Sequence, residues 1–350
     1  MSKLITSING SIYSPAHIFV SYNIHRTIYQ IKIYFGANMK MKKITLALGG
    51  GGTKGFAHIG VIKQLEKYGY QPSAIAGTSV GGIVGSLYAV GYSVADIESF
   101  ACSLNYAKLF SRNIDDAPSL LGLGGLYSLL EKYLKNKTFN DLLIPFAVTA
   151  VDSKSGSEYI INSGKIIDAV KATTAIPGIF PAFIHNDKNL VDGAVLNPIP
   201  VNIARWLKDD VPVIAISLSA PPDKWSSLPK YEFPSFVPVP QFMVHKFNQM
   251  RLGKALESFT QSLELMMNMI AWLRIQEDKP DVLINPSVYK YTMIDDVDVN
   301  EMIQLGENSI KDKITEISDA YSISRRVRRW IRASKTPGLL LEAPISTESE

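Results

Sequence analysis

The chain has 350 residues, of which 46% are apolar, and its formal net charge is only +4. This composition excludes global disorder, and the weak net charge does not indicate a protein that binds nucleic acid. The single cysteine, Cys102, excludes an intrachain disulfide and fits a reducing compartment. No apolar run reaches the roughly 18 residues of a membrane-spanning helix. We therefore expect a cytoplasmic protein without a transmembrane segment.

The first 40 residues differ from the rest of the chain, because they contain no Asp or Glu and show no clean hydrophobic period. Polar residues and a proline interrupt any signal-peptide core. We expect residues 1–40 to be a disordered or non-native N-terminal extension. A targeting peptide is the alternative.

From residue 44 onward, apolar strand patterns alternate with helical patterns. Such alternation predicts an α/β fold with a mostly parallel sheet and helices on both faces. Ser93 and Asp96 have the spacing of a helix-capping box. The expected strands are 44–48, 73–77, 144–152, 157–164, a strand and turn over 189–195, 211–219 and 281–286, and the expected helices are 53–69, 80–91, the segment after Ser93, and 165–175.

The C-terminal part is expected to continue the same globular unit over residues 207–320. It contains a strand, a proline-rich loop over residues 221–240 and then a long amphipathic helix. Seven apolar residues of this helix follow alternating steps of four and three, the pattern of a helix that packs one face on a core. They are Leu252, Leu256, Phe259, Leu263, Met266, Ile270 and Leu273.

A G-x-S-x-G sequence runs from Gly77 to Gly81 and is centred on Ser79. It lies between an expected strand and an expected helix, which is the setting of a nucleophile elbow. In that turn the serine hydroxyl rises above the edge of the sheet. Ser79 is therefore the candidate nucleophile.

Four consecutive glycines begin at Gly49 and lead to Lys54 and Gly55. A flexible linker, a phosphate-binding loop and an oxyanion hole are the alternatives. The dinucleotide fingerprint requires an acidic residue at the end of the second strand, which is absent here, and a P-loop requires a lysine where Phe56 stands. Backbone N–H groups of the glycine run that stabilise a developing oxyanion remain as the explanation.

A nucleophilic serine needs a base, and two candidates remain open. Asp192 ends an expected strand and is followed by Gly193, so its carboxylate could reach the serine directly. His245 would instead complete a Ser–Asp–His triad. His58 is expected to pack inside the helix that follows the glycines.

The glycine loop with Lys54, the elbow around Ser79 and the turn Asp192–Gly193–Ala194 together resemble the patatin-like phospholipase family. The resemblance covers residues 44–206 and implies a patatin-like three-layer α/β catalytic domain. It implies a Ser79–Asp192 dyad that hydrolyses lipid acyl esters without a metal or cofactor. It also implies that the oxyanion hole lies at Gly50, Gly51 and Gly52. A non-catalytic protein that binds lipid or a partner is the rival hypothesis.

Residues 321–350 are expected to form a basic segment and a frayed tail. Within this segment Arg325, Arg326, Arg328 and Arg329 flank Trp330 on an expected helix. Basic amphipathic helices bind anionic membrane surfaces. Peripheral contact with the inner membrane surface is one hypothesis, and a helix docked on the protein core is the other.

Overall fold

The computed structural model describes residues 41–111, 119, 121–229, 251–331 and 339–340. Residues 43–350 group as one compact unit. The expected N-terminal extension, residues 1–40, lies outside the described residues.

The centre of this unit is one mixed sheet with the strand order β5-β6-β3-β2-β1-β7-β8. Strand β1 pairs in parallel with β7, β7 with β8, and β2 with β3, whereas β4 and β6 run antiparallel to β3. The sheet is thus mostly parallel in the part that carries the motifs. The strands are β1 (Lys42–Leu48), β2 (Tyr70–Gly77), β3 (Phe146–Asp152), β4 (Ser157–Ile161), β5 (Phe183–His185), β6 (Lys188–Asp192), β7 (Val213–Ile216), β8 (Val282–Ile284) and β9 (Leu339–Leu340).

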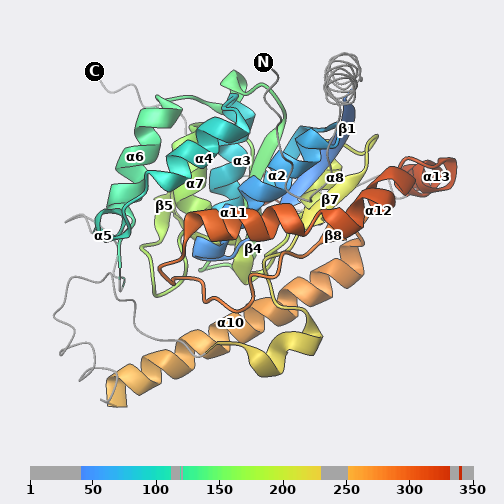
Figure 1. Ribbon diagram of the computed structural model, residues 1–350. Coiled ribbons are helices and arrows are strands. Elements are labelled where there is room, and N and C mark those ends of the chain that lie inside the picture. The colour runs from blue at the N-terminus through green and yellow to red at the C-terminus, as the bar shows by residue number, and fades with distance from the viewer. Residues whose placement is uncertain (1–40, 112–118, 120, 230–250, 332–338, 341–350) are drawn as a thin grey trace, which may run out of the picture. The chain divides into compact units, whose positions relative to one another are not determined.

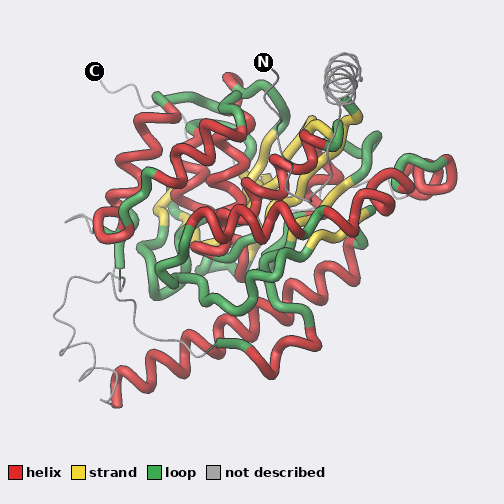
Figure 2. The backbone as a smooth tube through the Cα atoms, viewed as in Figure 1, coloured by secondary structure: helices red, strands yellow, loops and turns green. Residues whose placement is uncertain are grey.

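Helices cover both faces of the sheet, as Figures 1 and 2 show. Alternating residues of β1 explain the three layers. Leu46 and Leu48 belong to the large core on one face, while Ala47 packs with Ile203 and Ala271 on the other. The helices are α2 (Ala57–Lys67), α3 (Val80–Val90), α4 (Val94–Cys102), α5 (Tyr106–Leu109), α6 (Gly124–Leu134), α7 (Ile166–Thr173), α8 (Val201–Leu207), α10 (Arg251–Asp278), α11 (Val299–Asn308), α12 (Ile314–Asp319) and α13 (Ile323–Ile331).

The predicted α/β class and the alternation of strands and helices are confirmed. The capping box is present, since the Ser93 hydroxyl accepts a hydrogen bond from the Asp96 N–H and the Asp96 carboxylate accepts one from the Ser93 N–H. Strand β5 was not predicted, because three residues are too few for a hydrophobic period to be recognised.

Helix α10 is present as predicted, but much of its predicted apolar stripe is exposed. Phe259, Met266 and Leu273 of the predicted stripe are 52%, 53% and 57% exposed. The buried residues of α10 include Thr260, Glu264, Asn268 and Ala271. Leu263 of the stripe does pack against the core. The prediction that the stripe packs on the core is therefore met only in part, because the surface beneath α10 also offers polar groups that require polar partners. The side chains of Leu252 and Leu256 lie outside the described residues.

The basic helix α13 is also only partly as expected. Arg329 is buried, forms an ion pair with Asp281 at 3.2 Å and donates a hydrogen bond to the Ala320 carbonyl at 2.7 Å. Arg326 and Arg328 are exposed. Arg329 therefore does not face a membrane, because its charge is already neutralised inside the protein. The side chain of Trp330 lies outside the described residues.

Candidate active site

Ser79 occupies the sharp turn between β2 and α3. Its backbone φ is 54°, a left-handed value that costs energy for a residue with a side chain. The turn is tight enough that a Cβ atom on Gly81 would lie 2.2 Å from the Leu48 carbonyl oxygen. These features are those of a nucleophile elbow.

A hydrogen-bond chain from the neighbouring strand holds this turn. The Ser79 N–H donates to Thr173 Oγ1 at 3.0 Å, and the Thr173 hydroxyl donates to the Thr149 carbonyl at 2.7 Å. Thr173 is buried and was not among the predicted site residues. Its contact with Ser79 joins residues that are 94 positions apart in the sequence, and local patterns do not indicate such a contact.

Asp192 ends β6 and is almost completely buried. Its Oδ1 accepts a hydrogen bond from the Ala194 N–H at 2.8 Å. Burial raises the pKa of Asp192 to about 7, and hydrogen bonding from the Ser79 hydroxyl and the Ala194 N–H offsets part of that rise. Within the described residues, Asp192 Oδ2 has no partner at full hydrogen-bond geometry. A serine that is close but imperfectly aligned is common in a site without substrate.

The glycine loop offers two free N–H groups instead of three. The Gly50 N–H donates to the Pro198 carbonyl at 3.0 Å, so the prediction that Gly50 is an oxyanion donor is not met. Among the described residues, neither the Gly51 N–H nor the Gly52 N–H has an acceptor. Gly52 has a φ of 59°, and a Cβ there would lie 1.8 Å from the Met293 carbonyl oxygen. Only glycine fits this position.

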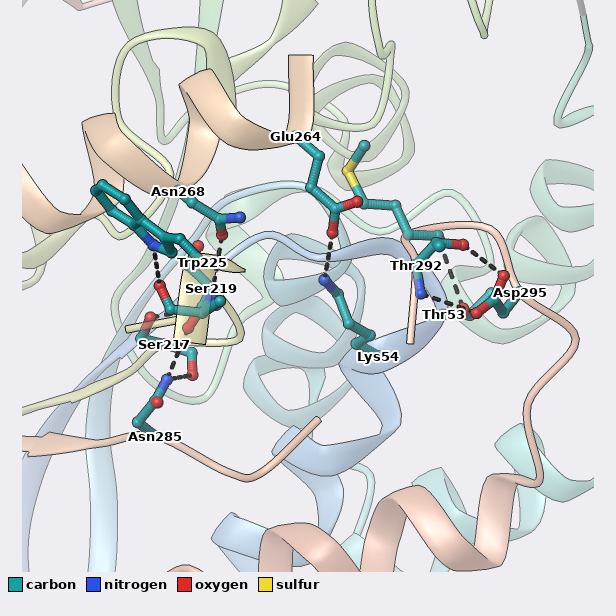
Figure 3. A network of polar contacts seen from close by, with 12 residues as sticks. Thr53, Lys54, Ser217, Ser219, Trp225, Glu264, Asn268, Asn285, Thr292 and Asp295 are labelled. Carbon is teal, nitrogen blue, oxygen red and sulfur yellow. Dashed lines mark hydrogen bonds and ion pairs between the residues drawn. The ribbon is translucent and has the colours of Figure 1, made fainter. Parts of the chain in front are cut away.

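Lys54 follows the glycines, and its charge lies inside the protein. It forms an ion pair with Glu264 of α10 at 3.0 Å, and both side chains are less than a tenth exposed (Figure 3). The charge of Lys54 is thus neutralised by Glu264 and does not face solvent. The pair connects the glycine loop to α10.

His58 of α2 holds the glycine loop through a hydrogen bond to its first residue, Gly49. Its Nε2 donates a hydrogen bond to the Gly49 carbonyl at 2.8 Å, and burial lowers the pKa of His58 to about 4. The ring is therefore neutral, and His58 packs in α2 as predicted. The alternative base, His245, lies outside the described residues.

An apolar cavity of about 850 Å³, which includes its open mouth, lies beside Ser79. Gly52 and Ser79 form one part of its wall, and apolar side chains from several helices and loops form the rest. They include Ile83, Leu87, Phe110, Leu123, Phe180 and Ile294. Among the described residues, no cluster of His, Cys, Asp and Glu could hold a metal ion.

Known proteins are similar to the part of the chain that carries this site. Residues 46–205 match the family model described as patatin-like phospholipase. An uncharacterised NTE family protein of Mycobacterium tuberculosis is 32% identical over 51% of this chain and 49% of its own length. Lysophospholipase NTE1 of Candida albicans is 29% identical over 49% of this chain and 13% of its own.

The mouse protein named patatin-like phospholipase domain-containing protein 6 is 28% identical over 51% of this chain and 14% of its own. The chain thus spans half or less of the length of these relatives. A crystal structure of VipD from Legionella pneumophila aligns with a TM-score of 0.48 and 13% identity, over 80% of this chain and 67% of VipD.

The mostly parallel sheet, the strained serine elbow and the glycine loop define a patatin-like α/β domain. Residues 46–205 of this chain belong to the patatin-like phospholipase family. Among the described residues, none of the helices is both long enough and apolar enough to cross a membrane.

Proposed function

We propose that the chain is a serine acyl hydrolase that cleaves lipid acyl esters through an acyl-serine intermediate. The observation that carries this proposal is that the strained Ser79 lines an apolar cavity and lies next to the buried Asp192. The family match and the printed names of the lysophospholipase and phospholipase relatives support it.

In the proposed reaction, Ser79 Oγ attacks the ester carbonyl carbon while Asp192 accepts the hydroxyl proton. The carbonyl oxygen becomes an oxyanion, which the Gly51 and Gly52 N–H groups stabilise. The intermediate collapses when the alcohol leaves with the proton from Asp192. Asp192 then takes a proton from water, the hydroxide attacks the acyl-serine, and the fatty acid departs as Ser79 recovers its proton.

The pKa of Asp192 favours its role as the base. An ordinary aspartate is too weak a base to deprotonate a serine, whereas a carboxyl with a pKa of about 7 binds the proton far more strongly. Because only the ionised carboxylate accepts a proton, kcat/KM should fall as the pH drops below about 7.

The apolar lining of the cavity supports a lipid as the proposed substrate. This lining is almost entirely apolar and is continuous with Ser79, which suits a fatty-acyl chain. We therefore propose activity of the phospholipase A or lysophospholipase type. The exposed side chains of α13, which include Arg326 and Arg328, are proposed to give salt-sensitive contact with an anionic membrane on the cytoplasmic side.

Three variants test the dyad on a short-chain ester and on a phospholipid. Ser79→Ala and Asp192→Asn should each lower turnover by about 10³-fold or more, because the two residues act as a unit. His245→Ala is the matched control and should leave turnover unchanged. Loss of turnover in His245→Ala with retention in Asp192→Asn would replace the dyad by a triad. Lipid binding without turnover in the wild type would favour the non-catalytic alternative.

A further inference from the structure

Helix α10 packs on the domain through Leu263, Ala271 and Ile275, and polar groups of its inner side bind the domain as well. Three residues of its inner side make these bonds. Glu264 pairs with Lys54 at 3.0 Å, and Asn268 Oδ1 accepts a hydrogen bond from the Ala220 N–H at 3.1 Å (Figure 3). Arg274 donates to the Leu196 carbonyl at 2.9 Å. The inner side of α10 is therefore part apolar and part polar, and a second set of apolar residues remains outside.

That apolar side lies on the outside of the described structure. At about 100° per residue, Phe259, Met266 and Leu273 fall within about 40° of one another on the helix surface. Leu265, Met269 and Trp272 widen this surface, and they are 46%, 45% and 36% exposed. We call these six residues the outer face of α10. Contiguous exposed apolar surface of this kind marks an interaction site.

The outer face also lacks charge. Glu264 is the only charged residue between Phe259 and Leu273, and it is buried on the opposite side. A segment of this length spans about 22 Å of helix. The face is therefore long, apolar and uncharged, as in helices that lie in the plane of a lipid surface.

The outer face borders the apolar cavity. Cε1 of Phe259 lies 4.0 Å from the position that a Cβ on Gly178 would take, and Gly178 lies between the cavity-lining residues Ile176 and Phe180. Met267, the neighbour of Met266, packs against Met293 and Ile294, which also line the cavity. These two contacts place the outer face and its helix beside the lining of the cavity.

We infer that the outer face of α10 docks on the acyl region of a lipid surface and delivers acyl chains to the cavity. This inference rests on the proposed lipid ester hydrolysis, because the occupant is identified from the apolar character of the face and its position beside the cavity. It differs from the proposed contact of α13, which is electrostatic. Binding through α10 is apolar, so it needs no anionic lipid and persists in high salt.

Vesicle binding tests the inference. In the Ser79→Ala background, which leaves the lipid intact, the protein should co-sediment with phosphatidylcholine vesicles in about 0.5 M salt, where charge contacts are screened. The triple variant Met266→Gln, Met269→Gln and Leu273→Gln keeps good helix formers and should lower the partition coefficient at least about tenfold. Ile184→Gln is the matched control, because Ile184 is an equally exposed apolar residue on β5, and it should bind unchanged.

The same substitutions with Ser79 intact separate this inference from the proposed function. The triple variant should hydrolyse a soluble short-chain ester at the wild-type rate and lose hydrolysis of vesicle lipid. If the wild type does not hydrolyse the short-chain ester, the proposed function is refuted instead. Equal vesicle binding by the triple variant and its parent would overturn the docking surface.

Two other occupants of the face would give distinct results, and each would overturn the inference. A second copy of the chain would make the parent a dimer and the triple variant a monomer, with no difference in vesicle binding. A segment of the same chain over the face would leave the parent unable to bind neutral vesicles, and the triple variant would then melt at a lower temperature.

Discussion

Strand β1 and helix α10 both carry regular apolar patterns, yet β1 buries its leucines whereas α10 buries several polar residues and exposes part of its apolar stripe. Leu46 and Leu48 of β1 are fully buried in the core. In α10 the apolar Met266 and Leu273 are exposed, and the buried inner side carries Glu264 and Asn268. A hydrophobic period shows which residues share a face of an element, but the surroundings decide which face is buried.

The surroundings of α10 impose this choice because they contain groups that cannot remain unpaired. Lys54 is buried, and a buried charge without a partner costs several kcal/mol. Glu264 supplies the partner from a position 210 residues away. The orientation of α10 is thus the one in which the charge of the glycine loop is neutralised.

The largest expected effect comes from breaking this pair. Glu264→Leu should lower the free energy of unfolding by about 3–5 kcal/mol, because Lys54 is left charged and buried. Urea unfolding measures the change. The double variant Lys54→Met with Glu264→Leu removes both charges and should recover most of the loss. A double variant that is no more stable than Glu264→Leu would contradict the view that charge pairing orients α10.

The next effect concerns the buried carboxyl of Asp192, whose pKa is raised by burial. Because the pKa of Asp192 is about 7 in the folded protein and near 3.8 when unfolded, the native state holds a proton that the unfolded state releases between these values. Stability from this group is therefore lost as the pH rises from about 4 to 7. Asn cannot ionise, so Asp192→Asn should be more stable than the wild type at pH 8, on the order of 2–4 kcal/mol.

Urea unfolding at two pH values checks this expectation. The difference between Asp192→Asn and the wild type should nearly vanish near pH 4, where the wild-type carboxyl is protonated in the native state. A difference that is the same at pH 4 and pH 8 would mean that ionisation of Asp192 does not cause it.

The smallest effect is expected on the outer face of α10. Met266→Gln should change the free energy of unfolding by no more than about 0.5 kcal/mol, because the side chain is already exposed. Leu46→Ala is the contrasting variant and should cost about 2–5 kcal/mol. A loss of 2 kcal/mol or more in Met266→Gln would show that something covers this face in solution.

The parts of the site that the sequence could predict are local. The elbow around Ser79 and the turn after Asp192 are recognised because neighbouring glycines and strand patterns define them. The engagement of Gly50 with Pro198 and the support of Ser79 by Thr173 depend on chain segments far apart in sequence. The burial of Arg329 likewise depends on Asp281, which lies 48 residues earlier. Hydrophobic periods and short motifs carry no information on such long-range polar pairs.

The most direct test of the central claim, that Ser79 is an activated nucleophile, is covalent labelling with a fluorophosphonate followed by peptide mass spectrometry. A fluorophosphonate reacts with a serine whose hydroxyl is deprotonated by a nearby base. The account predicts stoichiometric modification of Ser79 in the wild type, none in Ser79→Ala and labelling at least about 10²-fold slower in Asp192→Asn. Labelling of another serine, or equal rates in Asp192→Asn and the wild type, would contradict it.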